Sequence, residues 1–353
     1  MSIDVKINEA EEAALSWLRE SFLKANRKGF AHSRRNYLPS IFAWRTPYPE
    51  TSGYIIENFI KLNTGILHDT EEIGIEVAYW LCDMQHEEGY YISGISGNSP
   101  SFFNTAQVLF GLREANLFKP NEIYTKAISK ALQWLLSCIN DEGMCKQGLY
   151  KPNYFASYYS RALWPILLCL DKNNNEKVKN SLMLLYDNRN EYSGFNQMGF
   201  MPDKPALTHT IAYSWEGFFE SGLLLHDKSI LEYCIKMSYK LLEVIKRDKK
   251  LYGIYSRDWK PGSNFQCVTG QAQCISNFCK AYEYSNDKNF LDIAEILLSE
   301  MMQWQVLSKN PEHHGAFPAS VPVFGSYFPF QYVNWTNKFF LDACYQFKRN
   351  KKA

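Results

Sequence analysis

Three side chains that can carry protons occur close together in the chain, at His209, Tyr213 and Glu216. Residues three or four positions apart lie on the same face of an α-helix, so these side chains align if a helix covers this stretch. Imidazole, phenol and carboxylate groups abstract and return protons in lyases, epimerases and hydrolases. A single histidine at a helix start more often caps that helix, so it is the grouping of all three that favours catalysis.

Glu50 is a fourth candidate for catalysis. It lies between Pro49 and Thr51, at the expected start of a helix. Aimed at a central opening, its carboxylate would act as an acid or base, but an acid in a first helical turn also binds free backbone N–H groups and stabilises the helix dipole. The sequence leaves both functions open. Thr51 and Tyr54, in the same stretch, are expected to bind hydroxyl groups of a substrate.

Arginines lie beside the polar parts of the sequence at Arg45, Arg161 and Arg257. A planar guanidinium neutralises a carboxylate, and this is required when the C5 proton of a uronic acid is removed. Arg161 and the nearby Tyr158 are expected to bind a carboxylate or phosphate of the substrate, and Arg45 is expected to contact the substrate as well. Arg257 is expected instead to pair with Asp258 and to hold a loop.

The elements that position these residues follow a repeated pattern. Six times, an apolar stretch with helical spacing is followed by a glycine and an apolar or aromatic residue, at intervals of 60, 54, 51, 59 and 62 residues. These glycines are Gly29, Gly89, Gly143, Gly194, Gly253 and Gly315. A repeat of this length accommodates two helices.

A second series of marks runs out of phase with the glycines. It consists of clusters of Thr, Asn, Ser, Tyr and Gln that each open another apolar stretch. The clusters cover residues 50–54, 104–107, 157–161, 210–216, 269–273 and 334–337. Each repeat is therefore predicted to be a hairpin of two helices.

The first helix of each hairpin has one polar side. In residues 7–25, Ala10, Trp17 and Phe22 keep helical spacing while acidic and basic residues fill the other side. The second helices are apolar on nearly all sides, which is typical of buried helices. We therefore predict an all-α fold, an (α/α)6 toroid of six outer and six inner helices, in which ring closure replaces the polar capping repeats of an open solenoid. It is predicted to be one domain over residues 1–353, with repeats at 7–62, 71–115, 121–170, 174–225, 228–284 and 287–347.

In such a toroid the polar clusters converge at one end of the ring, and this end is the predicted site. Additional ligand contacts are expected from amide and indole groups, although amides at helix starts also serve as caps; these residues are Trp44, Asn104, Gln107, Gln271, Asn334 and Trp335. Glu50 and Glu216 fall in the first and fourth repeats, across the ring, whereas glycoside hydrolysis requires two carboxylates roughly 5 to 10 Å apart. Asp258 is the alternative partner for Glu50.

The composition excludes some ligands and partners. A formal charge of +1, from 38 basic and 37 acidic side chains, gives no broad basic surface for nucleic acid. Aromatic residues make up 16% of the chain, which suits stacking on sugar rings or enclosing an apolar ligand. The pair His313 and His314 has no further clustered ligands, so we expect neither a metal nor another cofactor.

The sequence also favours a cytoplasmic protein. The nine cysteines form no Cys-x-x-Cys pair, and their odd number suits a reducing compartment. No secretory signal is visible at the N-terminus, and the longest apolar run, residues 162–170, is too short to span a bilayer. The basic residues 348–352 are expected to be solvated and disordered.

Three segments carry a resemblance to a known group of proteins. The runs 44–54, 269–273 and 332–340 resemble toroid proteins encoded beside bacterial capsule and exopolysaccharide assembly genes, and the likeness covers nearly the whole chain. It implies a toroid fold and a carbohydrate context. Residues 270–287 are similar to the toroid domain of glucuronyl C5-epimerases, an architecture that polysaccharide lyases and unsaturated-uronide hydrolases share. Residues 85–89 and 133–143 resemble helix ends of terpene cyclases and prenyltransferases, but no Asp-rich diphosphate motif or zinc-binding set accompanies them.

These observations predict a soluble enzyme that modifies or cleaves a polysaccharide or its precursor, with other polysaccharide-assembly proteins as further partners. Proton transfer is assigned to His209, Tyr213 and Glu50 or Glu216. Epimerisation or β-elimination is favoured over hydrolysis because tyrosines and arginines outnumber paired acids. A non-catalytic glycan-binding or scaffold protein and a cyclase for an apolar chain stay open as alternatives. An enzyme predicts shifted pKa values at the site, a binding module mainly aromatic and amide groups, and a cyclase an apolar cavity.

Overall fold

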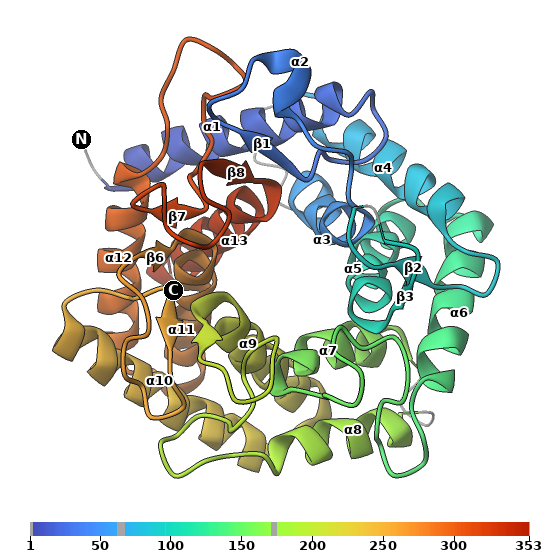
Figure 1. The fold of residues 1–353 in the computed structure, drawn as a ribbon, viewed down its shortest axis with the longest axis vertical. Coiled ribbons are helices and arrows are strands. Elements are labelled where there is room, and N and C mark those ends of the chain that lie inside the picture. Colours follow the sequence, from blue (N-terminus) through green and yellow to red (C-terminus); the bar gives the residue numbers. More distant parts are fainter. Residues whose placement is uncertain (1–2, 62–67, 96, 171–174, 353) are drawn as a thin grey trace.

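The protein consists of two concentric rings of helices. The computed structural model describes residues 3–61, 68–95, 97–170 and 175–352. Within these ranges, six α-helices form the outer ring and six form the inner ring, and outer and inner helices alternate along the chain (Figure 1). The predicted (α/α)6 toroid is confirmed.

The outer ring consists of α1 (Ile3–Lys24), α4 (Thr70–Met84), α6 (Glu122–Ser137), α8 (Glu176–Tyr186), α10 (Lys228–Asp248) and α12 (Lys288–Gln303). The inner ring consists of α3 (Pro49–Ile60), α5 (Phe102–Phe118), α7 (Ser160–Cys169), α9 (Thr208–Leu225), α11 (Val268–Ser285) and α13 (Asn334–Lys352). A short helix, α2 (Ser40–Ala43), and a 3-10 turn, η1 (Ser157–Tyr159), lie between these elements. Residues 62 and 174, where one predicted repeat ends and another begins, lie outside the described residues.

The pattern of side chains explains the position of each ring. In α1, Trp17 and Phe22 are completely buried, whereas Glu9 and Glu12 on the other side are exposed. Helix α9 is buried on all sides over most of its length. Amphipathic helices therefore form the outer wall and apolar helices the inner wall.

The first and last parts of the chain close the ring. Helix α13 packs against both α3 and α1. Asn58 Nδ2 donates to Asp342 Oδ1 at 2.8 Å. Strand β1 (Ser33–Arg35) pairs antiparallel with β8 (Gln331–Val333), and Ser33 lies opposite Val333. Both rings are thus continuous from the last repeat to the first.

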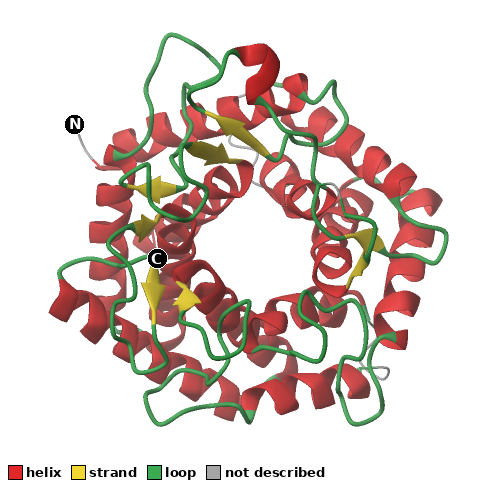
Figure 2. Ribbon diagram, in the orientation of Figure 1, coloured by secondary structure: helices red, strands yellow, loops and turns green. Residues whose placement is uncertain are grey.

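Short strand pairs connect the starts of the inner helices. They are β2 (Tyr91–Ile92) with β3 (Pro100–Ser101), β4 (Ala206–Leu207) with β5 (Ile254–Tyr255), and β6 (Gln266–Cys267) with β7 (Ser320–Val321). Strands β3, β4, β6 and β8 each lead directly into an inner helix. Figure 2 shows the strands in yellow, distributed around the ring with their loops. They hold the beginnings of the inner helices in place.

The repeated glycines allow consecutive outer helices to approach. Gly89, after α4, has φ +99°, and a Cβ atom there would overlap the backbone carbonyl of Lys130 in α6. Gly315, after α12, has φ +83° and packs in the same way on Ala13 of α1. A side chain at either position would be strained and would also clash.

The end of the chain differs from its prediction. Helix α13 continues to Lys352, and the expectation of disorder after Lys348 was wrong. Lys348 pairs with Glu11 of α1, and Arg349 pairs with Glu283 of α11, so the basic residues bind two neighbouring helices. None of the described helices is long and apolar enough to cross a membrane.

Candidate active site

The polar clusters meet at the N-terminal end of the inner ring. Many of their side chains form hydrogen bonds to the neighbouring repeat instead of facing a ligand. Ser157 Oγ of η1 lies 2.8 Å from Ser214 Oγ of α9. Thr269 Oγ1 of α11 lies 2.6 Å from Thr336 Oγ1 of α13. In each pair, two hydroxyls from different helices form a hydrogen bond with each other. Buried polar groups require such a partner.

Three amides predicted to bind a ligand are also used within the fold. Gln107 Nε2 donates to the backbone carbonyl of Arg161 at 3.2 Å, and Asn334 Nδ2 donates to Thr51 Oγ1 at 3.0 Å. Gln271 bonds to the outer helix α12. None of the three amides has any exposed surface. These amides and Thr51 are therefore bound within the fold and are not available to a ligand.

Glu50 belongs to a hydrogen-bonded chain at the start of α3. Asn104 Nδ2 donates to the Tyr48 hydroxyl at 2.9 Å, and this hydroxyl donates to the Glu50 carboxylate. Burial raises the pKa of Glu50 to about 7, although the bond from Tyr48 and the charge of Arg161 act in the opposite direction. The side chain still keeps intermediate exposure to solvent. Such a carboxyl group can donate and accept protons at neutral pH.

Tyr213 and His209 lie one turn apart on α9, with ring centroids 4.3 Å apart. The Tyr54 hydroxyl interacts with the Tyr213 hydroxyl, which otherwise has no well-aligned hydrogen-bond partner among the described residues. Burial and the Glu50 charge raise the pKa of Tyr213, so the phenol stays protonated. Burial lowers the pKa of His209 to about 4, so the imidazole is neutral. Gln273 Oε1, 2.6 Å from His209 Nδ1, can only accept, and Nδ1 therefore carries the proton while Nε2 is unprotonated.

Tyr54 completes this group of titratable side chains. It is 1% exposed, and burial followed by interactions with Tyr213 and Glu50 raises the pKa of Tyr54. We call Tyr48, Glu50, Tyr54, His209 and Tyr213 the Glu50 cluster. It combines one carboxyl group of shifted pKa with three phenols and a neutral imidazole.

Aromatic rings adjoin the Glu50 cluster. Phe103 lies 5.3 Å from Tyr213, and Tyr158 lies 5.8 Å from Phe103, as centroid distances. On another side, Trp335 packs edge-on against His32 at 4.8 Å, and His32 lies 5.5 Å from Tyr48 of the cluster, as centroid distances. Tyr158 and Trp335 are therefore near the cluster, and because they are only 2% and 5% exposed they belong to its buried apolar surroundings.

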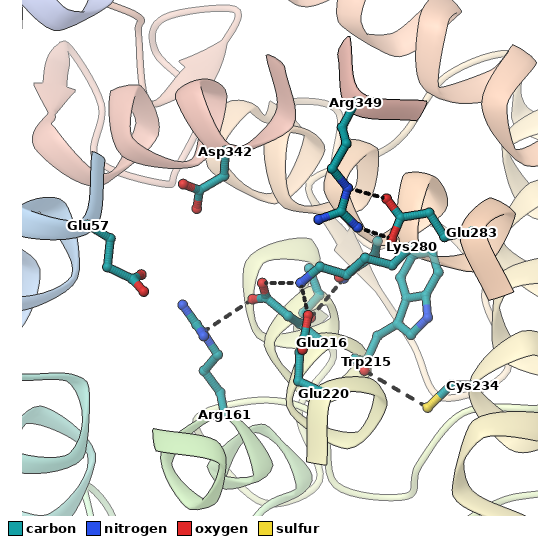
Figure 3. A network of polar contacts seen from close by, with 12 residues as sticks. Glu57, Arg161, Trp215, Glu216, Glu220, Cys234, Lys280, Glu283, Asp342 and Arg349 are labelled. Carbon is teal, nitrogen blue, oxygen red and sulfur yellow. Dashed lines mark hydrogen bonds and ion pairs between the residues drawn. The ribbon is translucent and has the colours of Figure 1, made fainter. Parts of the chain in front are cut away.

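Arg161 and Glu216 are paired with each other in the interior of the ring. Arg161 Nε lies 3.2 Å from Glu216 Oε2, and Lys280 Nζ lies 3.1 Å from Glu216 Oε1 (Figure 3). Burial alone would raise the pKa of Glu216, but Arg161, Lys280 and Lys338 lower it to about 2. Glu216 is a poor proton acceptor in this state, and its carboxylate faces these cations rather than the Glu50 cluster.

The same pair lines a cavity of about 460 Å³ at the opposite, C-terminal end of the inner ring. Its walls come mainly from the second halves of α3, α9, α11 and α13, with Arg161 and Trp164 from α7. We call it the C-terminal cavity. The sequence predicted a site only at the N-terminal end, so the position of this cavity was not anticipated.

Trp44 and Arg45 lie together in a surface hollow of about 350 Å³. The Trp44 ring stacks on Trp17 with centroids 5.6 Å apart. Arg45 is close enough to His32 to act, after burial, in lowering the pKa of His32 to about 3. Trp44 and Arg45 therefore lie outside the Glu50 cluster, beside aromatic residues that pack around it.

Asp258 is bound by Lys260 instead of the expected Arg257. Its carboxylate lies 2.7 Å from Lys260 Nζ and accepts from Ser256 Oγ at 2.5 Å. The bonds from Lys260 and Ser256 lower the pKa of Asp258 to about 2. Among the residues that the structure describes, no three His, Cys, Asp or Glu side chains are grouped closely enough to hold a metal ion.

Sequence reasoning missed Tyr48, Lys280 and Lys338. Tyr48 stands in the polar stretch before α3, and its proximity to Glu50 in sequence was an available signal. Lys280 follows Phe278 and Cys279, and Lys338 precedes two phenylalanines. A single lysine within an apolar inner helix is rarely buried without a charged partner, and this could have marked both residues.

Comparison with known proteins supports the architecture. No protein-family model and no curated protein matches the sequence. An unsaturated glucuronyl hydrolase from Bacillus sp. GL1 superimposes with a TM-score of 0.72 at 14% identity, over 97% of each chain. A D-mannose isomerase superimposes with a TM-score of 0.72 at 12% identity, over 99% of each chain. A sugar epimerase from a ruminal bacterium gives 0.66 at 11% identity, over 96% of this chain and 98% of its own. These likenesses establish that the chain has the α/α-toroid fold of these proteins.

Proposed function

We propose that the protein is a sugar-modifying enzyme that transfers a proton to or from a substrate bound at the Glu50 cluster. The observation that carries this proposal is the Glu50 carboxyl group, which is largely enclosed, still reached by solvent, and has a pKa raised by burial to about 7. A group that changes protonation near neutral pH is suited to act as a general base and then as an acid.

The neighbouring side chains supply the other functions that such a reaction needs. The protonated Tyr213 hydroxyl interacts with Tyr54 as an acceptor and has no well-aligned acceptor for its own proton among the described residues, so it can donate to the substrate oxygen on which negative charge develops. The unprotonated Nε2 of His209 can accept a proton from a substrate hydroxyl. Arg161 acts on the cluster through its charge, which limits how far burial raises the pKa of Glu50.

The composition of the cluster favours epimerisation, isomerisation or β-elimination over hydrolysis. Hydrolysis of a glycosidic bond uses two carboxyl groups about 5 to 10 Å apart. Among the described residues, the interactions that set the pKa of Glu50 include no second carboxylate. Glu216 is held by Arg161 and Lys280, which suits a role in positioning Arg161.

The proposed substrate is a sugar or uronic acid unit of a surface polysaccharide or of its precursor. The resemblance of residues 44–54 and 332–340 to proteins of capsule and exopolysaccharide clusters supports this context, as does the action of the structural neighbours on carbohydrates. A binding module has no need of a carboxyl group with a shifted pKa, and a cyclase for an apolar chain needs an apolar site, whereas the Glu50 cluster contains a carboxyl group, three phenols and an imidazole.

The test is solvent exchange in heavy water. The purified protein is incubated with a panel of aldoses, ketoses, uronic acids, nucleotide sugars and uronic-acid polymers, and deuterium incorporation at carbon is followed by NMR. We expect incorporation into one class of substrate. The variant Glu50→Gln should lower the rate by about 10²-fold to 10⁴-fold, which is typical for loss of a general base.

The matched control is Glu87→Gln, which changes an exposed glutamate in the turn after α4 and should leave the rate unchanged. Exchange that persists at the wild-type rate in Glu50→Gln would remove Glu50 from the mechanism. Absence of exchange with the whole panel would count against proton transfer at carbon altogether.

A further inference from the structure

The C-terminal cavity is separate from the Glu50 cluster. It lies among the second halves of four inner helices, and no member of the Glu50 cluster lines it. Its volume of about 460 Å³ falls within the range of small-molecule sites, roughly 300 to 1,000 Å³. The proposed reaction does not use this space.

The charges around the cavity balance. Five acidic and five basic side chains line it. Lys280 Nζ lies 2.6 Å from Glu220 as well as binding Glu216. Lys338 pairs with Asp342 and lies 3.7 Å from Glu57. Because the charges are matched within the protein, the cavity offers no net attraction for an anion or a cation.

Several polar atoms in the cavity wall still lack partners. Among the described residues, no hydrogen-bond partner exists for Nη1 of Arg161, Oδ1 of Asn58, Oγ of Ser276 or Oε1 of Gln346. Arg161 and Asn58 are each 1% exposed, and Ser276 is 4% exposed. A buried donor or acceptor without a partner costs about 1 to 3 kcal/mol, so a bound ligand that supplies the partner is favoured.

The orientation of the charged groups agrees with a ligand in this space. In Figure 3 the carboxylates of Glu57 and Asp342 and the guanidinium of Arg161 point toward a common region. Trp164 lines the same cavity and lies 4.6 Å from the Arg161 guanidinium. If these ion pairs served only to hold the helices together, they would add little to the stability of the fold, because buried ion pairs contribute weakly. A purely structural network would also not require an open volume.

The unpartnered atoms indicate the chemistry of the ligand. Arg161 provides donors, Asn58 and Gln346 provide acceptors, and Ser276 can do both. Hydroxyl groups also donate and accept, so several hydroxyls on one ring can satisfy walls of mixed character. We propose that the C-terminal cavity is a second binding site, for an uncharged, hydroxyl-rich ligand the size of a monosaccharide or disaccharide.

The experiment uses the indole NMR signal of Trp164, assigned with the variant Trp164→Phe. The full chain is titrated with D-glucose, D-mannose and D-galactose, and in separate samples with D-glucuronate and inorganic phosphate. We expect the Trp164 signal to move with at least one neutral sugar and to respond less to the anions. Glu50→Gln should leave this response intact, which distinguishes it from any event at the Glu50 cluster.

Two substitutions on α9 form a matched pair for the test. Leu223 lines the cavity and is 41% exposed, whereas the adjacent Leu224 does not line it and is 38% exposed. Leu223→Trp should narrow the cavity and weaken sugar binding by at least about tenfold, while Leu224→Trp should not. A Trp164 signal that no sugar moves would overturn the site. A response to phosphate or glucuronate alone would overturn the class of ligand, and equal losses in both variants would overturn the location.

Discussion

The Nε atom of Arg161 lies 3.2 Å from Oε2 of Glu216, and this buried pair separates the two polar ends of the inner ring. On one side, the charge of Arg161 acts on the Glu50 cluster, where it opposes the burial-raised pKa of Glu50. On the other side, both residues line the C-terminal cavity. The same buried pair therefore influences the pKa of the proposed catalytic group and forms part of the wall of the second site.

Glu216→Gln should destabilise the protein by about 3 kcal/mol or more, because it leaves the buried Arg161 with uncompensated charge, whereas Lys280 keeps its pair with Glu220. Urea denaturation measures this change. The control is Glu283→Gln, which removes the half-exposed pair with Arg349 and should cost less than about 1 kcal/mol. Similar small losses in both variants would contradict a dominant role for the buried pair.

The activity should follow the ionisation of Glu50. If deprotonated Glu50 is the base, kcat/KM rises with pH and levels off above the pKa of Glu50, at about 7. Tyr48→Phe removes a hydrogen bond that lowers the pKa of Glu50, so it should move the midpoint of the profile to higher pH. A rate that falls as the pH rises through 7 would show that Glu50 acts in its protonated form.

Two histidines that are buried in the neutral form should make the protein less stable as the solution becomes acidic, and the raised pKa of Glu50 opposes part of this loss between pH 7 and 4.5. Burial lowers the pKa of His209 to about 4 and of His32 to about 3, both from 6.5. The unfolded chain therefore binds more protons below pH 6.5, and the contribution is lost as the pH falls from 6.5 through the two lowered values, at about 1.4 kcal/mol per pKa unit.

Urea denaturation across this pH range measures the slope. The variant His209→Gln should reduce the pH dependence, and substitution of the exposed His68 should not. If His209→Gln has the same pH dependence as the unchanged protein between pH 6.5 and 4, the neutral burial of His209 is wrong.

The fold was predictable because its signals are local. The apolar stripe of Ala10, Trp17 and Phe22 repeats with helical spacing, and the polar clusters mark helix starts within a few residues. The use of each polar side chain depends instead on distant contacts. Thr269 meets Thr336, 67 residues away, so the sequence did not show that these hydroxyls would satisfy each other.

The candidate site was predicted in part for the same reason. Glu50, Tyr213 and His209 were recognised by their chemical types, and the structure places them close together. The position of Glu216 depends on Arg161 and Lys280, which come from two other helices, and no local pattern specifies this arrangement. The C-terminal cavity exists only when the ring is closed, so its walls could not be assembled from separate segments of sequence.

Gly217 determines how closely α9 approaches α7. A Cβ atom at Gly217 would overlap the backbone of Ser160 and Arg161, whereas at Gly222, one turn further along α9, it would meet only side-chain atoms of α10, the nearest at 3.0 Å. Gly217→Ala should therefore cost about 1 to 3 kcal/mol or more, and Gly222→Ala should be nearly neutral, because alanine favours the helix. Thermal denaturation of the two variants compares them directly, and equal stabilities would contradict this close packing.

Tyr213→Phe separates a catalytic role from a structural one. The Tyr213 hydroxyl is buried and interacts with the Tyr54 hydroxyl without good hydrogen-bond geometry, so its removal should change the stability by less than about 1.5 kcal/mol. If this hydroxyl binds the developing charge of the substrate, kcat should fall by about 10²-fold to 10³-fold. Tyr124→Phe is the matched control, because the Tyr124 hydroxyl on the outer helix α6 is also buried and also meets a second tyrosine, Tyr79, without good hydrogen-bond geometry. That variant should keep full activity, and a fall in kcat of the same size in both variants would assign the effect of Tyr213 to packing.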